Sequence, residues 1–184
     1  MSSIWLRARV VLLAALGLKQ RAMRCVADAL RCEPDNGYWL ATWAHWLAED
    51  GDFSGARDAL LRCVAFQPGR AQGWFNLGYV CERLGLVAEA ESAFQRATEL
   101  DARLDRAWYG LALALIAQDR LGEAVAALKV NTALQPMSPH GWYQMGRVHA
   151  DLGAPEEARR VIDHLRQFEP KIAAQLARDT GLCA

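Results

Sequence analysis

Apolar residues recur along this chain with the spacing of paired amphipathic helices. Between residues 71 and 104 they lie three or four positions apart, the spacing of one helix face, in two consecutive stripes. The first stripe comprises Trp74, Leu77, Gly78 and Cys81. The second comprises Ala90, Phe94, Ala97 and Leu100. Gly85 between them is a turn residue that tolerates a positive φ angle. The pattern predicts a helical hairpin, which needs neighbours to bury both stripes.

The same pattern returns every 34 residues, which predicts those neighbours. The turn position is occupied by Gly17, Gly51, Gly85, Asp119 and Gly153. A small residue that lets two helices approach closely recurs as Ala22, Ala56, Ala90, Ala124 and Ala158. The position that ends the second helix is occupied by Pro34, Pro68, Ala102, Pro136 and Pro170. Three columns in one phase indicate tandem repeats of a single unit.

The chain resembles the tetratricopeptide repeat family, whose signature is W-x2-L-G-x2-Y, then A-x3-F, then P, over 34 residues. The matching residues are Trp74-x2-Leu77-Gly78 with Ala90-x3-Phe94, Trp108-x2-Leu111 with Ala124-x3-Leu128, and Trp142-x2-Met145-Gly146 with Ala158-x3-Ile162. Cys81 departs from the Tyr of that signature, Ala102 from its Pro, and Asn131 from a small apolar residue. The first unit is the weakest, with Leu6, Arg9 and Val10 at the Trp, Leu and Gly positions.

This resemblance implies an all-α fold, a right-handed α-solenoid of five helix-turn-helix repeats followed by a C-terminal capping helix. The repeat domain would span 3–172, as units 3–36, 37–70, 71–104, 105–138 and 139–172, and 173–184 would form the capping helix and tail. First helices are expected at 3–16, 37–50, 71–84, 105–118 and 139–152. Second helices are expected at 19–32, 53–66, 87–100, 121–134 and 155–168. Ser138, before Pro139, is the expected N-cap of the last first helix.

Composition narrows the function classes. The 184 residues carry 21 basic and 21 acidic side chains, and a net charge of zero argues against nucleic acid as the partner. The sequence contains no apolar span of 18 residues, so no membrane-spanning helix is predicted. The run from Val10 to Leu18 is in phase with the repeats and lacks a clear cleavage site, which favours a repeat helix over a secretory signal. Five cysteines without C-x-x-C spacing indicate free thiols in a reducing, cytoplasmic compartment.

Catalytic and metal-binding motifs are missing from the sequence. There is no phosphate-binding loop, no H-E-x-x-H and no G-x-S-x-G, and none of the four histidines stands at metal-ligand spacing from Cys or Asp. The sequence therefore predicts a protein that is not an enzyme and that holds no cofactor or metal.

The resemblance implies a peptide-binding groove, because first helices in the family line a concave surface that holds peptide segments or helices of partner proteins. The residues at the inward positions are Tyr38, Thr42, His45, Gln72, Phe75, Asn76, Tyr79, Arg83, Arg106, Tyr109, Leu113, His140, Tyr143, Gln144 and Arg147. Phe75, Tyr109 and Tyr143 share one repeat position, so they either form an aromatic ladder in the groove or pack against neighbouring helices. Lysines of the family's carboxylate clamp are missing, which disfavours binding of a chaperone C-terminus.

The N-terminal edge offers a second surface. Trp5 and Leu12 stand where Trp39 and Trp46 stand in the next unit, yet no neighbour is predicted for them. They meet a partner or a second copy of the chain, or Met1–Ser3 fold over them, or the chain is a fragment. The expected function is a non-catalytic scaffold for protein interactions. The alternatives are an assembly subunit that self-associates through this edge, and an assembly factor associated with an enzyme.

Overall fold

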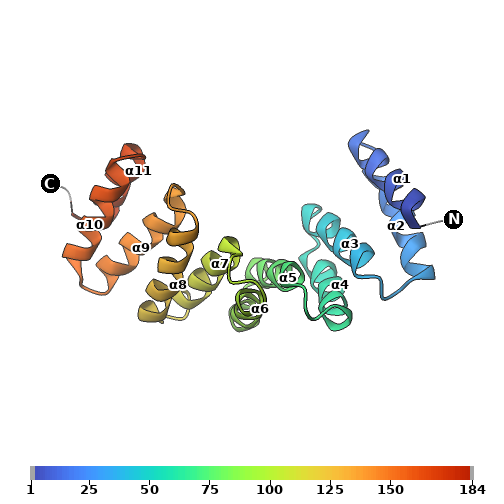
Figure 1. Ribbon diagram of the computed structural model, residues 1–184, viewed down its shortest axis with the longest axis horizontal. Helices are drawn as coiled ribbons and strands as arrows, with labels where there is room; N and C mark the ends of the chain where they lie inside the picture. Colours follow the sequence, from blue (N-terminus) through green and yellow to red (C-terminus); the bar gives the residue numbers. More distant parts are fainter. Residues whose placement is uncertain (1–2, 183–184) are drawn as a thin grey trace. The chain divides into compact units, whose positions relative to one another are not determined.

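The computed structural model describes residues 3–182, and every regular element in this range is an α-helix (Figure 1). The helices are α1 Ser3–Ala15, α2 Lys19–Cys32, α3 Gly37–Glu49, α4 Phe53–Phe66, α5 Ala71–Arg83, α6 Val87–Leu100, α7 Asp105–Ile116, α8 Leu121–Leu134, α9 Pro139–Asp151, α10 Pro155–Arg166 and α11 Pro170–Asp179. The ten repeat helices begin at the expected residues and end within two residues of the expected ends. The predicted all-α repeat fold is confirmed. The C-terminal helix begins at Pro170, three residues before the expected start of the capping helix at residue 173.

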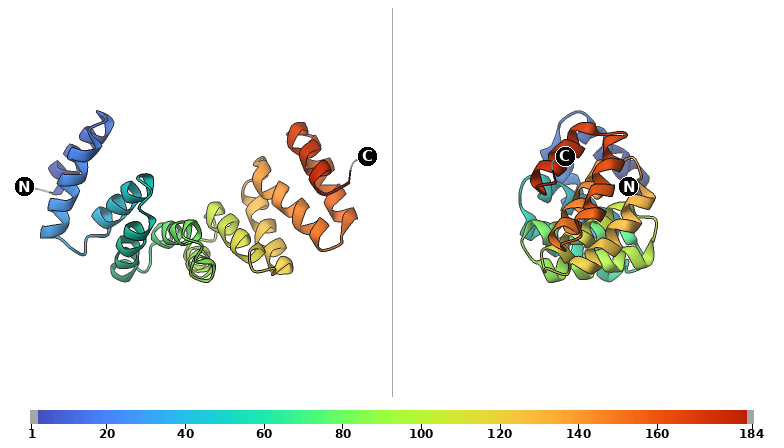
Figure 2. Two further views of the ribbon diagram at one scale, coloured as in Figure 1. Left: turned by 180° about the vertical axis from the view of Figure 1, so that it is seen from behind. Right: turned by 90° about the vertical axis from the view of Figure 1, so that its left-hand side faces the viewer.

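The chain forms two compact units, Met1–Gly85 with α1 to α5 and Leu86–Ala184 with α6 to α11. In the first unit, α1 pairs with α2 and α3 with α4, while α2 packs on α3 and α4 on α5. In the second unit each helix from α6 to α10 packs on the next, and α11 covers α10 and part of α9. Figure 2 shows α11 beside α10 in both views. Each first helix after α1 therefore contacts the second helix of the preceding repeat.

Every turn of the expected glycine column has a left-handed backbone. Gly17, Gly51, Gly85 and Gly153 have φ angles between 69° and 85°, and Asp119 has a φ of 58°. Asp119 is the single described non-glycine residue with a positive φ, which is costly for a side chain with a Cβ. The alanine column is equally consistent. Ala22, Ala56, Ala90, Ala124 and Ala158 are all at most 1% exposed, so a larger side chain would not fit there.

A recurring hydrogen bond holds the loop that joins successive repeats. The indole Nε1 of Trp74 donates to the carbonyl oxygen of Pro68 at 2.8 Å, and Trp142 donates to that of Pro136 at 2.9 Å. Trp108 makes the same bond to Ala102 at 3.0 Å. Because the acceptor is a backbone oxygen, the bond does not need a proline, which explains how the chain tolerates alanine in that column.

Asn131 lies in the last turn of α8, where the family signature has a small apolar residue. Its side chain is buried and hydrogen-bonded. Its Nδ2 donates to the carbonyl oxygen of Asp105 at 2.9 Å, at the start of α7. A Cβ on Gly141 would lie 2.2 Å from Asn131 Oδ1, so the missing side chain of Gly141 lets α9 approach α8 here. Asn131 thus links α8 to the start of α7, its partner helix in the same repeat, at the point where α9 approaches α8.

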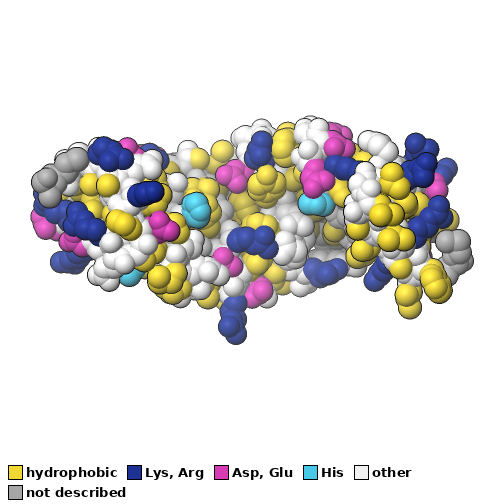
Figure 3. Space-filling view, turned by 90° about the horizontal axis from the view of Figure 1, so that it is seen from above, with side chains coloured by type: hydrophobic (Ala, Val, Ile, Leu, Met, Phe, Trp, Pro, Cys, Tyr) yellow, Lys and Arg dark blue, Asp and Glu magenta, His cyan; other side chains and the backbone are white. Residues whose placement is uncertain are grey.

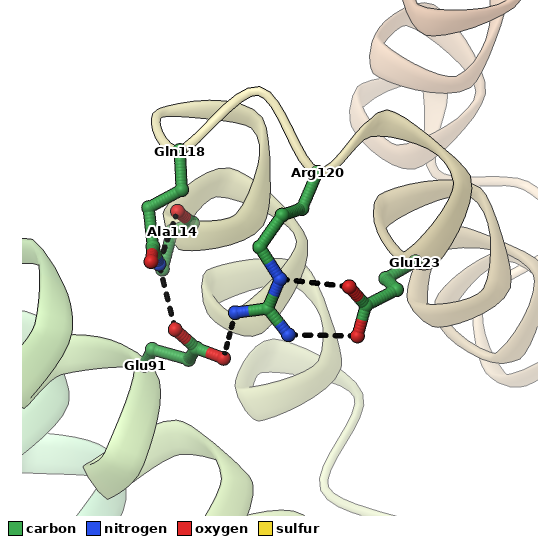
Figure 4. Close-up of polar contacts among 5 residues, drawn as sticks. All are labelled: Glu91, Ala114, Gln118, Arg120 and Glu123. Atoms are coloured by element: carbon green, nitrogen blue, oxygen red, sulfur yellow. Dashed lines mark hydrogen bonds and ion pairs between the residues drawn. The ribbon is translucent and has the colours of Figure 1, made fainter.

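A charged cluster that the repeat pattern does not reveal links three helices of the second unit (Figure 4). Arg120, in the α7–α8 turn, contacts Glu91 of α6 at 2.5 Å and both carboxylate oxygens of Glu123 of α8 at 2.7 Å. Gln118 donates to the other oxygen of Glu91 at 2.7 Å. The hydrogen bonds from Arg120 lower the pKa of Glu123 below its usual value, and the two carboxylates raise the pKa of Arg120.

We predict that Asp119→Gly stabilises the protein by about 0.5–1 kcal/mol, because glycine adopts the left-handed turn without a Cβ penalty. Chemical denaturation followed by circular dichroism measures the change. The reciprocal variant, Gly85→Asp, has open space around the added Cβ, so it tests the backbone effect alone and is expected to lose a similar amount. Destabilisation by Asp119→Gly would contradict the argument.

We also predict a pH-dependent effect of Arg120→Gln. The folded protein holds the pKa of Glu123 low, so its contribution to stability is complete above the unfolded pKa of about 4.3 and is lost as the pH falls through the lower folded value. Wild type and Arg120→Gln should differ in urea midpoint at neutral pH, and the difference should shrink as the pH falls below the unfolded pKa of about 4.3.

Arg96→Gln is the matched control, because Arg96 forms an exposed pair with Glu99 within α6 alone. A difference between wild type and Arg120→Gln that stayed constant across this pH range would contradict the coupling to Glu123.

Candidate binding surfaces of the two units

Five of the predicted groove residues line one pocket in the first unit. The pocket, named here the α3–α5 pocket, has a volume of about 360 Å³ and lies between α3, α5 and the end of α4. Its predicted lining residues are Tyr38, Thr42 and His45 of α3 and Gln72 and Asn76 of α5. Helical spacing explains the set, since residues four and seven positions apart share one helix face.

The α3 wall of this pocket is held in place from both sides. Tyr38 packs edge-on against Trp39 with ring centroids 4.8 Å apart, and the Arg7 guanidinium lies 4.3 Å from the Tyr38 ring centroid. Thr42 Oγ1 donates to the Tyr38 carbonyl oxygen at 2.8 Å, one turn earlier. The aromatic ring thus presents an ordered surface at the pocket.

The α5 wall carries a pair of amides. Gln72 Nε2 donates to Asn76 Oδ1 at 2.7 Å. Within the described part of the chain, this leaves the Asn76 Nδ2 group as a donor and the Gln72 Oε1 atom as an acceptor with no further protein partner. One donor beside one acceptor matches the C=O and N–H of one residue in an extended segment.

Tyr79 and Arg83 continue along α5 but do not enlarge this pocket. Arg83 Nη1 donates to the Tyr79 hydroxyl at 3.3 Å, and its guanidinium lies 4.6 Å from the Phe53 ring centroid. Tyr79 lines an adjoining hollow of about 90 Å³ together with His45 and Asn76. Arg83 therefore contacts aromatic rings of its own unit.

The second unit has a pocket of about 270 Å³ lined by four more of the predicted residues, Tyr109 of α7 and His140, Tyr143 and Gln144 of α9. We call it the α7–α11 pocket, because Ile172 and Gln175 of the capping helix form its remaining wall. The Tyr143 hydroxyl hydrogen-bonds the Asp179 carboxylate, and this bond raises the pKa of Tyr143. Sequence reasoning missed this contribution, since it assigned α11 to capping alone.

Other predicted residues line neither pocket. Phe75 belongs to the first unit and Tyr109 and Tyr143 to the second, so the structure brings together two of the three aromatic residues expected to form a ladder. Leu113 is half-buried in α7, while Arg106 and Arg147 are exposed on α7 and α9. At the N-terminal edge, Trp5 and Leu12 are exposed, whereas Trp39 and Trp46 are buried as expected.

Two larger hollows lie elsewhere on the second unit. One of about 570 Å³ is formed by α8 to α10 around Trp142, and one of about 530 Å³ by α6 to α8 around Trp108. Most of their charged side chains are already paired, Arg160 with Glu157 at 2.9 Å and Arg120 with Glu91 and Glu123, although Lys129 in the first hollow has no ion-pair partner among the described residues. A ligand there would have to displace ion pairs, whereas the α3–α5 pocket offers amide groups without partners.

Little in the described residues points to other chemistry. No three His, Cys, Asp or Glu side chains between residues 3 and 182 are grouped to hold a metal ion. Cys25, Cys63 and Cys81 are buried and form no disulfide, and burial raises the pKa of Cys63. Cys32 is exposed, and Cys183 lies outside the described residues.

No helix in the described range has the length and apolar character needed to cross a membrane. Basic and acidic side chains are interspersed on the face shown in Figure 3.

Comparisons with known proteins give the fold and the type of repeat. A family model described as "Tetratricopeptide repeat" matches residues 42–104 and 90–130. No curated protein sequence matches significantly. The crystal structure of MamA is 21% identical, with a TM-score of 0.82 over 88% of this chain and 95% of that one. A MamA fragment from Desulfovibrio magneticus RS-1 is 17% identical, with a TM-score of 0.82 over 91% and 94%.

The structure of YrrB, described as "a TPR protein with an unusual peptide-binding site", is 19% identical and has a TM-score of 0.82 over 92% of this chain and 88% of that one. At these identities the likeness concerns the fold. The 34-residue period, the helix pairs and the family model that matches within residues 42–130 together show that this chain is built from tetratricopeptide repeats.

Proposed function

We propose that this chain is a non-catalytic scaffold that binds a peptide segment or helix of a partner protein on the inner faces of its first helices. Residues 3–172 would be the binding domain, and 173–184 would serve as its cap. The α3–α5 pocket carries the proposal, because five residues expected from the repeat positions lie together around it. The match to the tetratricopeptide repeat model supports the same general role.

The chemistry of the α3–α5 pocket suits a main-chain ligand. Asn76 Nδ2 and Gln72 Oε1 would pair with the C=O and N–H of one residue of an extended segment, which point to the same side, as a bidentate contact that does not depend on the ligand side chain. The Tyr38 ring and the Ala41 side chain offer apolar contact for the neighbouring side chain. A partner of this kind would be an extended segment that becomes ordered on binding, at moderate affinity.

The α7–α11 pocket would hold a second stretch by aromatic contact. Tyr109 and Tyr143 are both half-buried there, and Gln144 adds an amide. Arg106 and Arg147 lie on the same two helices and are exposed, so acidic side chains in the ligand would be favoured at this unit. Aromatic and Arg side chains are the residue types that dominate binding energy at interfaces.

We predict that Asn76→Ala and Tyr109→Ala each weaken peptide binding about 10-fold or more, since each removes a hydrogen bond or aromatic contact worth about 1–2 kcal/mol. The probe is a random dodecapeptide library displayed on phage and selected on the wild-type chain. Fluorescence anisotropy then gives the Kd of the selected peptides. The thermal midpoint of both variants should stay close to that of wild type.

Phe66→Ala is the control, because Phe66 is an exposed aromatic residue at the end of α4 that does not line the α3–α5 pocket. Its affinity for the same peptides should match wild type. The proposal is wrong if the library yields no binder, or if the selected peptides bind Asn76→Ala and Tyr109→Ala as tightly as wild type.

A further inference from the structure

Helix α1 exposes an apolar face that the other first helices bury. Ile4 is 75% exposed, Trp5 72%, Val11 59%, Leu12 60% and Leu16 64%. Ala8 and Ala15 lie between them on the same side of the helix and are also exposed. Hydrophobic side chains also gather near the N-terminus in Figure 3. At 100° per residue the seven positions cover one side of α1 without a charged residue.

The repeat geometry indicates which kind of structural element fits this face of α1. Trp5 and Leu12 hold the third and tenth positions of their repeat. In the later repeats the same positions are buried, as Trp39 and Trp46, Gly73 and Val80, Ala107 and Ala114, and Gly141 and Val148. There they face the second helix of the preceding repeat, which packs on α3, α5, α7 or α9. The α1 face is therefore a helix-binding face against which no described helix of its own unit packs.

The rest of α1 is already fixed by its own unit. Val10 is 2% exposed and packs in the cluster that includes Ala22, Val26 and Trp39, with Leu6 and Leu13 beside it. Arg7 lies over Tyr38 of α3, and Arg9 lies at the edge of the apolar face. The outer face is thus an ordered surface. Burying its large side chains elsewhere in the unit would require α1 to give up this packing.

We propose that this face binds the same face of a second copy of the chain, as an antiparallel α1–α1 pair around a two-fold axis. Residues whose numbers add to 20 would lie opposite one another, so Trp5 meets Ala15 and Ala8 meets Leu12. In these two pairs a large side chain faces a small one, while Ile4 lies opposite Leu16 and Val11 lies opposite Arg9 at the edge of the face. The α2–α3 contact shows a similar relation, since Trp39 lies in one buried cluster with Ala22, Cys25, Val26 and Ala29. An uncharged face also requires an uncharged partner, and the second copy provides one.

The buried area is sufficient for such a pair. Five large side chains that are more than half exposed present of the order of 100 Å² each, about 500–600 Å² together, which is near the largest patch that soluble monomers expose. Two such faces would bury about 1,000–1,200 Å², at the lower end of specific interfaces. The association is therefore expected in the micromolar range rather than as a permanent dimer.

The other end of the chain does not offer a matching surface. Helix α11 buries Ala173, Leu176 and Ala177 against its unit and leaves Lys171 and Arg178 exposed. A charged outer face is a poor partner for the apolar face of α1. Pairing of like ends, which closes at two copies, is favoured over head-to-tail growth.

Sedimentation equilibrium over a concentration series from micromolar to submillimolar tests the proposal. Wild type should show a monomer–dimer equilibrium, and Leu12→Asp should weaken it about 100-fold, because a carboxylate would be buried without a partner. Met137→Asp is the matched control, since Met137 is 68% exposed in the α8–α9 loop and its variant should dimerise as wild type does. Circular dichroism should show both variants folded.

A cross-link distinguishes the two-fold pair from other contacts. Ala8→Cys, in a chain whose Cys32 and Cys183 are replaced by serine, should form a covalent dimer with a short bifunctional maleimide, whereas Ala126→Cys on α8 should not. A monomer at every concentration would overturn the proposal, as would a dimer that survives Leu12→Asp. The alternative that the N-terminal residues cover this face rests on Met1 and Ser2, which lie outside the described residues; Ser3 already begins α1.

Discussion

The whole structure depends on the burial of each first helix against the second helix of the preceding repeat. A hairpin of two helices buries one stripe between its own members and leaves another apolar stripe unburied, so the next repeat must cover it. Trp39, Ala107 and Val148 are each at most 1% exposed because such a neighbour is present. The glycine turns and the alanine column serve this contact, since they set the angle and the closeness of the helices that stack.

Because each first helix is buried on one side, its other side does not need to pack in the core. On α3 the buried side carries Trp39, Leu40 and Trp46, and the residues between them, Thr42 and His45, face the pocket instead. Polar side chains are tolerated there because the core does not use that side. The proposed binding surface would thus be a consequence of stacking, and its specificity would come from residues that the repeats do not need for their packing.

Local chemistry explains why the fold was predictable and parts of the site were not. Helix starts and left-handed turns follow from glycine, proline and periodicity, which act within a few residues. Side-chain partners do not: Ser138 stands at the expected N-cap but makes no capping bond, while Asn36 and Asp52 cap α3 and α4. The Arg120 cluster and the bond between Tyr143 and Asp179 join residues about 30 positions apart, beyond any local rule.

The two surfaces of the first unit are physically connected. Arg7 on α1 lies over Tyr38, and Tyr38 lines the α3–α5 pocket, so α1 presents its apolar face outward while its other side supports the pocket wall. A pair of chains joined through α1 would carry two such pockets on one assembly. A partner with two peptide segments would then bind by avidity, which multiplies modest affinities without any new contact. A pocket that relies on two amides and one aromatic ring would gain most from that arrangement, because each contact alone is weak.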